Sequence, residues 1–116
     1  MKKIVVGVTG ASGAQLAHHV LKALNNHDVD THLILSESAK TTIAHETLLK
    51  VTDFSALADH VYAETDIAAC VASGSFYTDG MIVVPCSMKT LSGIANAYDE
   101  NLVIRAADVC LKERRK

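Results

Sequence analysis

The stretch that decides the fold is Gly80-Met-Ile-Val-Val-Pro-Cys-Ser-Met-Lys-Thr-Leu-Ser-Gly-Ile-Ala95. Its short apolar run, Met81 to Val84, is typical of a buried parallel strand. A helix-like segment opens directly after Pro85 and Cys86, so hydroxyls and an ammonium group fall at its amino end. The free backbone N–H groups of a helix start attract anions, and an open α/β sheet binds its ligand at the carboxyl ends of its strands. We therefore predict an anion-binding turn at this point of the chain.

A second candidate turn, Thr9-Gly-Ala-Ser-Gly13, lies near the amino terminus. It departs from the dinucleotide fingerprint Gly-x-Gly-x-x-Gly, because Val8 stands where the first glycine belongs. No Gly-Lys-Ser or Gly-Lys-Thr follows, which excludes a Walker loop. What remains is a small-residue turn into a helix, where Ser12 can donate to a phosphate or a flavin edge; tight packing of strand on helix is the alternative. Together the two turns predict a pocket for a phosphorylated cofactor.

The segment Ser36-Glu37-Ser38 follows the second predicted strand. An NAD-binding protein usually places a carboxylate here to hold the ribose diol, and Glu37 is the candidate. Because Ser36 occupies the strand end itself, the pattern favours a mononucleotide without deciding the matter. The alternative is that Ser36 or Ser38 only caps the next helix.

Strand and helix signals alternate along the whole chain. In the predicted strand over residues 30–36, Thr31, Leu33 and Leu35 share one face, and His32 and Ile34 share the other. This alternation predicts an α/β fold with a doubly wound, mostly parallel sheet in a single domain over residues 1–116. The predicted strands cover 3–9, 30–36 and 81–84, and the predicted helices cover 14–26, 38–51, 54–60, 67–72, 87–97 and 102–115.

Composition narrows the class of protein. An aromatic content of 4% without Trp, and a net charge of −2, argue against a nucleic-acid partner. No apolar run approaches the roughly 20 residues that span a membrane. The three cysteines are odd in number and widely spaced, which favours a reducing cytoplasm over a disulfide framework. The six histidines and three cysteines lack metal-ligand spacing in the sequence, so we expect no metal.

Four blocks of the sequence resemble the flavin prenyltransferases of the UbiX type, a family that includes small subunits associated with phenolic-acid decarboxylases. These blocks are residues 9–13, 73–76, 85–93 and 105–115. The resemblance implies a Rossmann-like or flavodoxin-like domain that assembles into homo-oligomers, commonly dodecamers. Members of the family are usually longer, so we expect this chain to be the N-terminal part of the family domain, without its C-terminal portion.

The resemblance also implies a reaction, the transfer of a dimethylallyl group from dimethylallyl phosphate to reduced FMN. The prenylated FMN then serves a partner decarboxylase of the UbiD type, and no metal is needed. Carried onto this chain, Ser12 and Glu46 are the catalytic candidates, assisting proton movement and loss of phosphate. The implied cofactor-binding residues are Gly10, Ala11, Ser12, Ser36, Ser87, Met88, Lys89 and Thr90.

Two other functions stay open at the level of sequence. The second hypothesis is that the chain is an accessory subunit of a hydroxyarylic-acid decarboxylase, which binds FMN and has no turnover of its own. A nicotinamide-dependent oxidoreductase is a third hypothesis, disfavoured by the incomplete glycine fingerprint. Prenyl transfer predicts a new flavin species that depends on dimethylallyl phosphate, whereas the accessory subunit binds FMN alone and the oxidoreductase binds NAD(P)H.

Overall fold

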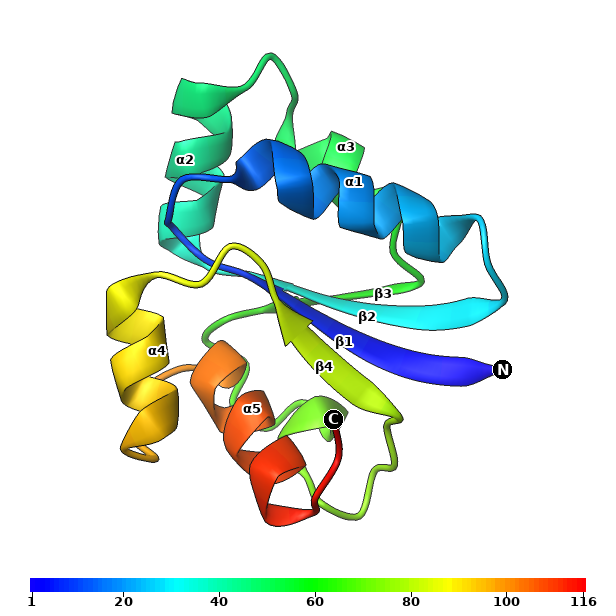
Figure 1. Ribbon diagram of the computed structural model, residues 1–116, viewed down its shortest axis with the longest axis vertical. Helices are drawn as coiled ribbons and strands as arrows, with labels where there is room; N and C mark the ends of the chain where they lie inside the picture. The colour runs from blue at the N-terminus through cyan, green and yellow to red at the C-terminus, as the bar shows by residue number, and fades with distance from the viewer.

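The computed structural model describes residues 1–116 and contains a parallel sheet of four strands in the order β3-β2-β1-β4 (Figure 1). The strands are β1 (Lys2–Val8), β2 (Val29–Leu35), β3 (His60–Ala63) and β4 (Gly80–Val83). The chain builds outward from β1 through β2 to β3, and then returns to place β4 on the other side of β1. The predicted doubly wound parallel sheet is therefore confirmed, and its topological switch point lies between β1 and β4.

Helices cover both faces of the sheet (Figure 1). On one face lie α1 (Ala14–Asn25), α2 (Glu37–Glu46) and α3 (Val51–Ser55); on the other lie the 3₁₀ turn η1 (Cys70–Ala72), α4 (Met88–Ala95) and α5 (Leu102–Lys112). None of these helices has the length and apolarity needed to cross a bilayer.

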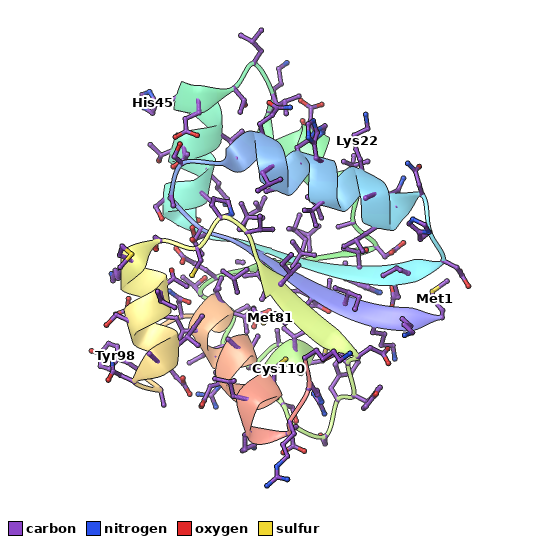
Figure 2. All side chains as sticks on the ribbon, viewed as in Figure 1. Met1, Lys22, His45, Met81, Tyr98 and Cys110 are labelled. Carbon is purple, nitrogen blue, oxygen red and sulfur yellow. The ribbon has the colours of Figure 1, made fainter.

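Each face of the sheet has its own apolar core. Leu33 of β2 packs in the first core with Phe54 of α3, and Ile34 packs in the second core with Val103 of α5. Adjacent residues of β2 thus enter opposite cores, as the predicted alternation requires. Figure 2 shows Met81 and Cys110 between the sheet and α5, while Lys22 and His45 point away from the sheet on the outer sides of α1 and α2.

The sequence-based prediction was wrong between residues 47 and 72. The predicted helix over 38–51 ends at Glu46, because Thr47 takes an extended conformation and its hydroxyl donates to the Ile43 carbonyl at 2.7 Å. The predicted helix over 54–60 ends earlier, at Ser55, and β3 follows, while residues 67–72 hold only η1. No residue of β3 is fully buried, so its sequence lacks the apolar run that marks a strand. The segment forms a strand because it pairs with β2.

Candidate functional site

A cleft of about 530 Å³ lies at the carboxyl ends of the strands. The turns after β2, β3 and β4 line it, together with the segment that leads into α5. Of the eleven lining residues only Ile67 and Ile104 are hydrophobic, and hydroxyl groups are the commonest polar groups among the rest. The cleft is therefore suited to a polar ligand, and it occupies the edge at which open α/β sheets bind their ligands.

The Thr9 hydroxyl connects the two turns that the sequence singled out. Its Oγ1 donates to the Pro85 carbonyl at 2.7 Å and accepts from the Ser87 backbone N–H at 2.8 Å. Ser87 in turn caps α4, because its Oγ accepts from the Thr90 N–H at 3.2 Å and donates to Thr90 Oγ1 at 2.9 Å. The structure thus brings the glycine turn after β1 to the start of α4, at the switch point of the sheet.

The turn after β2 packs closely on the glycine turn. Ser36 is buried and caps α2, with its Oγ accepting from the Ala39 N–H at 3.0 Å, and it also lines the cleft. Its Oγ also lies 3.2 Å from the Ser38 hydroxyl. A Cβ placed on Gly10 would lie only 2.5 Å from Ser38 Oγ, which is too close for any side chain. Glycine at position 10 therefore allows the backbone of the first turn to reach the edge of the cleft.

The single ammonium group of the cleft already has a partner. Lys89 Nζ lies 3.0 Å from Glu100 Oε1, and this contact raises the pKa of the lysine. A second carboxylate, that of Glu64, accepts from the Glu37 backbone N–H at 2.9 Å at the start of α2. Hydroxyls and backbone N–H groups are therefore the main groups that the cleft offers to a phosphate.

The predicted site residues fall into two neighbouring groups. Ser36, Ser87, Lys89 and Thr90 line the cleft itself. Beside it lies the glycine turn with Gly10, Ala11 and Ser12, and the Gly13 N–H of this turn donates to Glu46 Oε1 at 3.2 Å, which brings that carboxylate to the turn. Met88 belongs to neither group, since its side chain is 78% exposed and does not line the cleft.

Sequence reasoning missed the residues that β3 and the start of α5 bring to the cleft. Glu64 and Thr65 follow β3 directly, and they could not be placed at the carboxyl edge because the sequence predicted no strand over residues 60–63. Glu100 and Asn101 precede α5, and Asn101 Oδ1 accepts from the Ile104 N–H at 3.0 Å as its cap. The signal for Asn101 was present, because asparagine before an apolar helical run is a typical N-cap.

These features fit a phosphorylated flavin better than a nicotinamide dinucleotide. The volume lies within the range of about 300–1,000 Å³ that is usual for cofactor pockets. Glu37, the candidate for holding a ribose diol, does not line the cleft, and its Oε1 lies 3.1 Å from Lys40 Nζ. Burial raises the pKa of the Cys86 thiol, so this cysteine at the strand end is a poor nucleophile.

Comparison with known sequences gives a consistent result. The sequence model of the flavoprotein family matches residues 1–116. A probable UbiX-like flavin prenyltransferase from Sedimentibacter hydroxybenzoicus is 60% identical over 115 residues, which cover 98% of this chain and 61% of that protein. The flavin prenyltransferase UbiX of Thauera aromatica is 54% identical over 114 residues, covering 98% and 59% of the two chains. This chain thus spans about three fifths of the length of these curated relatives.

Solved structures agree with the sequence matches. The crystal structure of AnUbiX (PadA1) in complex with FMN and dimethylallyl pyrophosphate superposes with a TM-score of 0.97 at 53% identity, covering 98% of this chain and 61% of that one. A dodecameric FMN-dependent UbiX-like decarboxylase from Escherichia coli O157:H7 gives a TM-score of 0.96 at 56% identity, covering 98% and 62% of the two chains.

Proposed function

The chain belongs to the flavoprotein family, and from that premise we propose that it forms the FMN-holding part of a flavin prenyltransferase. The proposed reaction transfers a dimethylallyl group from dimethylallyl phosphate to reduced FMN. The observation that carries the proposal is the Thr9 hydroxyl, which holds the glycine turn and the start of α4 together beside a polar cleft. The similarity to named flavin prenyltransferases over nearly the whole of this chain supports it.

In the proposed complex the chain binds the cofactor through hydroxyls and backbone N–H groups. The Ser38, Ser87 and Thr90 side chains line the cleft near the starts of α2 and α4, where a phosphate finds the positive ends of two helix dipoles. The backbone of Gly10 and Ala11 is open to the cofactor, because Gly10 has no side chain to shield it. Lys89 supplies the only positive charge of the lining, shared with Glu100.

Two residues beside the glycine turn are the proposed catalytic groups. Bound reduced FMN supplies the electron-rich ring that receives the prenyl group. The Glu46 carboxylate is held at the turn by the Gly13 N–H, and there it accepts a proton released during the reaction. The exposed Ser12 hydroxyl lies in the same turn and donates to the departing phosphate, whose negative charge grows as its bond breaks.

The wider role of the protein is also a proposal. We infer that the prenylated flavin passes to a UbiD-type decarboxylase and that the chain assembles into a homo-oligomer, as the dodecameric relative from Escherichia coli O157:H7 does. We place the protein in the cytoplasm, because its three cysteines are all free.

The proposal is tested by anaerobic incubation of the chain with reduced FMN and dimethylallyl phosphate, followed by mass spectrometry of the flavin. We expect a flavin heavier by one dimethylallyl group, formed only when dimethylallyl phosphate is present. An Ser12→Ala variant should bind FMN and form this product more slowly. A chain that binds no FMN contradicts the proposal altogether.

One alternative has its own support. The Escherichia coli O157:H7 relative is described as an FMN-dependent decarboxylase, which agrees with an FMN-binding accessory subunit of a hydroxyarylic-acid decarboxylase. FMN binding without a new flavin species, both in this chain and in a chain carrying the rest of the family domain, favours that alternative.

A further inference from the structure

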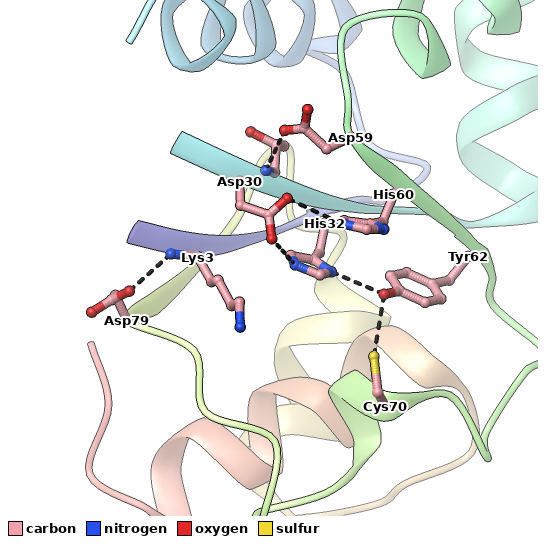
Figure 3. A network of polar contacts seen from close by, with 9 residues as sticks. Lys3, Asp30, His32, Asp59, His60, Tyr62, Cys70 and Asp79 are labelled. Carbon is pink, nitrogen blue, oxygen red and sulfur yellow. Dashed lines mark hydrogen bonds and ion pairs between the residues drawn. The ribbon is translucent and has the colours of Figure 1, made fainter. Parts of the chain in front are cut away.

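A second polar cluster lies on the sheet, away from the cleft (Figure 3). Asp30 and His32 stand two residues apart on β2, so both side chains leave the same face of the sheet. His60 is the residue of β3 that pairs directly with His32. We call these three residues the Asp30–His32–His60 cluster. It combines two imidazoles and a carboxylate, which are typical ligands of transition metals.

The Asp30 carboxylate lies between the two histidines. Its Oδ2 is 3.1 Å from His32 Nε2 and its Oδ1 is 3.1 Å from His60 Nε2. The three ligand atoms all lie within 4.8 Å of one another. Two ligand atoms that share a zinc ion at about 2.1 Å are separated by roughly 3.0–3.4 Å, depending on the coordination geometry. A separation of 3.1 Å is that of a hydrogen bond and also falls in this range, so each histidine nitrogen lies at coordination distance from one oxygen of the Asp30 carboxylate.

The second ring nitrogen of His32, Nδ1, has a hydrogen-bond partner, as is usual for a histidine that binds a metal. His32 Nδ1 lies 2.9 Å from the Tyr62 hydroxyl, which lies 3.3 Å from Cys70 Sγ (Figure 3). A partner on the second ring nitrogen fixes the orientation and tautomer of a ligating imidazole.

The tautomer of His32 decides what lies between His32 and Asp30. With the proton on Nε2, the neutral ring donates to Asp30 Oδ2, and Nδ1 accepts from the Tyr62 hydroxyl. With the proton on Nδ1, the ring donates to Tyr62, and the lone pair of Nε2 is available to a metal ion beside the Asp30 carboxylate.

We propose that Asp30, His32 and His60 bind one divalent transition-metal ion, of which Zn²⁺ is the representative. Asp30 and His32 form the preorganised half of the site. The two imidazole rings are stacked, with centroids 4.3 Å apart and planes 14° from parallel, so their lone pairs do not point at one atom. His60 must therefore turn its ring toward the metal, and its half-exposed side chain is free to do so. Water completes the coordination from the exposed side.

The bound metal has a structural role. It links β2 to the four-residue edge strand β3, whose own residues bury little surface. Lys3 opposes the metal, because its charge acts on His32 while its Nζ lies 5.0 Å from the centroid of the Phe76 ring. The site is independent of the proposed flavin chemistry, so a failure of one proposal does not affect the other.

Titration of the metal-free chain with Zn²⁺ against a chromophoric chelator tests the proposal. We expect one Zn²⁺ per chain, and a shift of the Nε2 signals of His32 and His60 in the imidazole ¹⁵N spectrum. The His60→Gln variant should lose affinity at least about 100-fold, since a ligand matters more than the outer partners whose loss costs about 10–100-fold. His27→Gln, at an exposed histidine outside the cluster, is the matched control and should bind as the parent does.

Two further variants keep the test decisive. Asp30→Asn preserves the shape of the side chain and removes the charge, so it should weaken Zn²⁺ binding as strongly as His60→Gln. Lys3→Gln should tighten it, because a neighbouring positive charge is lost. The proposal is overturned if the parent binds no Zn²⁺ stoichiometrically, or if His60→Gln retains the parent affinity and the parent ¹⁵N shifts of His32.

Discussion

The cleft and the Asp30–His32–His60 cluster share one sheet, yet they are assembled in different ways. The cleft is built from short runs of neighbouring residues, such as 36–38 and 87–90, that directly follow a strand. The cluster is built from single side chains that the register of β2 against β3 places side by side. A ligand site at strand ends can thus be read from local motifs, whereas a site across strands depends on pairing.

The two sites are far enough apart to be altered separately. Four residues of extended chain, from His32 to Ser36, span about 13 Å. The comparison therefore predicts that a variant of one site spares the other.

The largest effect is expected at the carboxylate beside the glycine turn. Glu46→Gln keeps a hydrogen-bond acceptor for the Gly13 N–H but cannot take up a proton. We expect prenyl transfer to slow by about 100-fold, the lower range of general acid–base catalysis. Single-turnover assays should show this loss while FMN affinity and Zn²⁺ affinity stay at the parent values. An unchanged rate would show that Glu46 only supports the turn.

The next largest effect is expected from a methyl group at the edge of the cleft. Gly10→Ala places a Cβ 2.5 Å from Ser38 Oγ, and such overpacking typically lowers the free energy of unfolding by about 1–3 kcal/mol. FMN binding should weaken because the turn must move. Denaturant titration and flavin fluorescence measure the two effects.

A second substitution, at Ser38, should relieve the clash that Gly10→Ala creates. Adding Ser38→Gly removes the two nearest atoms, Ser38 Oγ and Cβ, and leaves only the Ser38 backbone carbon at 3.1 Å, so the double variant should recover part of the lost stability. Gly74→Ala is the control on the other side of the molecule, since its Cβ meets only the flexible ends of Glu113 and Lys112 at 3.3–3.4 Å. Equal destabilisation at Gly10 and Gly74 would refute the packing argument.

A smaller effect is expected at the outer partner of the cluster. Tyr62→Phe removes the hydroxyl that lies 2.9 Å from His32 Nδ1, and should weaken Zn²⁺ binding about tenfold. FMN binding should not change. Chelator competition measures the first quantity, and a Cys70→Ala variant separates loss of the tyrosine contact from loss of the thiol behind it. Parent-like Zn²⁺ affinity in Tyr62→Phe would mean that the hydroxyl does not orient His32.

The smallest effect is expected at the exposed ion pair of the cleft. Lys89→Ala should weaken FMN binding only a few-fold, because Glu100 already neutralises much of the lysine charge and exposed pairs contribute little. Glu100→Gln should change FMN affinity in the opposite direction by freeing the ammonium group. Both differences should shrink as salt is raised. Titration of the two variants and the double variant at two salt concentrations decides whether Lys89 meets the cofactor.

Much of the fold and part of the cleft could be predicted because their signals are local. The apolar run before Pro85 marked β4, and the serine and threonine after it marked the start of α4. The glycine turn and Ser36 were recognised for the same reason. The contribution of Glu64 and Glu100 could not be predicted, because each lies beside an element whose position depends on packing.

Strand β3 is the clearest case of a feature that sequence could not identify. His-Val-Tyr-Ala has no buried residue of its own, and its neighbours include a short helix, so local preference favoured helix over residues 54–60. Its hydrogen bonds to β2 supply the stability that its side chains do not. With β3 unrecognised, His60 had no reason to lie beside His32, and the histidines looked unrelated.

The sequence by itself determined the parallel α/β architecture, the two turns at the carboxyl edge and the resemblance to flavin prenyltransferases, because each is encoded in consecutive residues. Only the tertiary structure decided that Thr9 joins the two turns, that Glu100 neutralises Lys89, and that Asp30, His32 and His60 meet. Those contacts join different strands, turns and helix starts. They arise from strand register and helix packing, which no local pattern specifies.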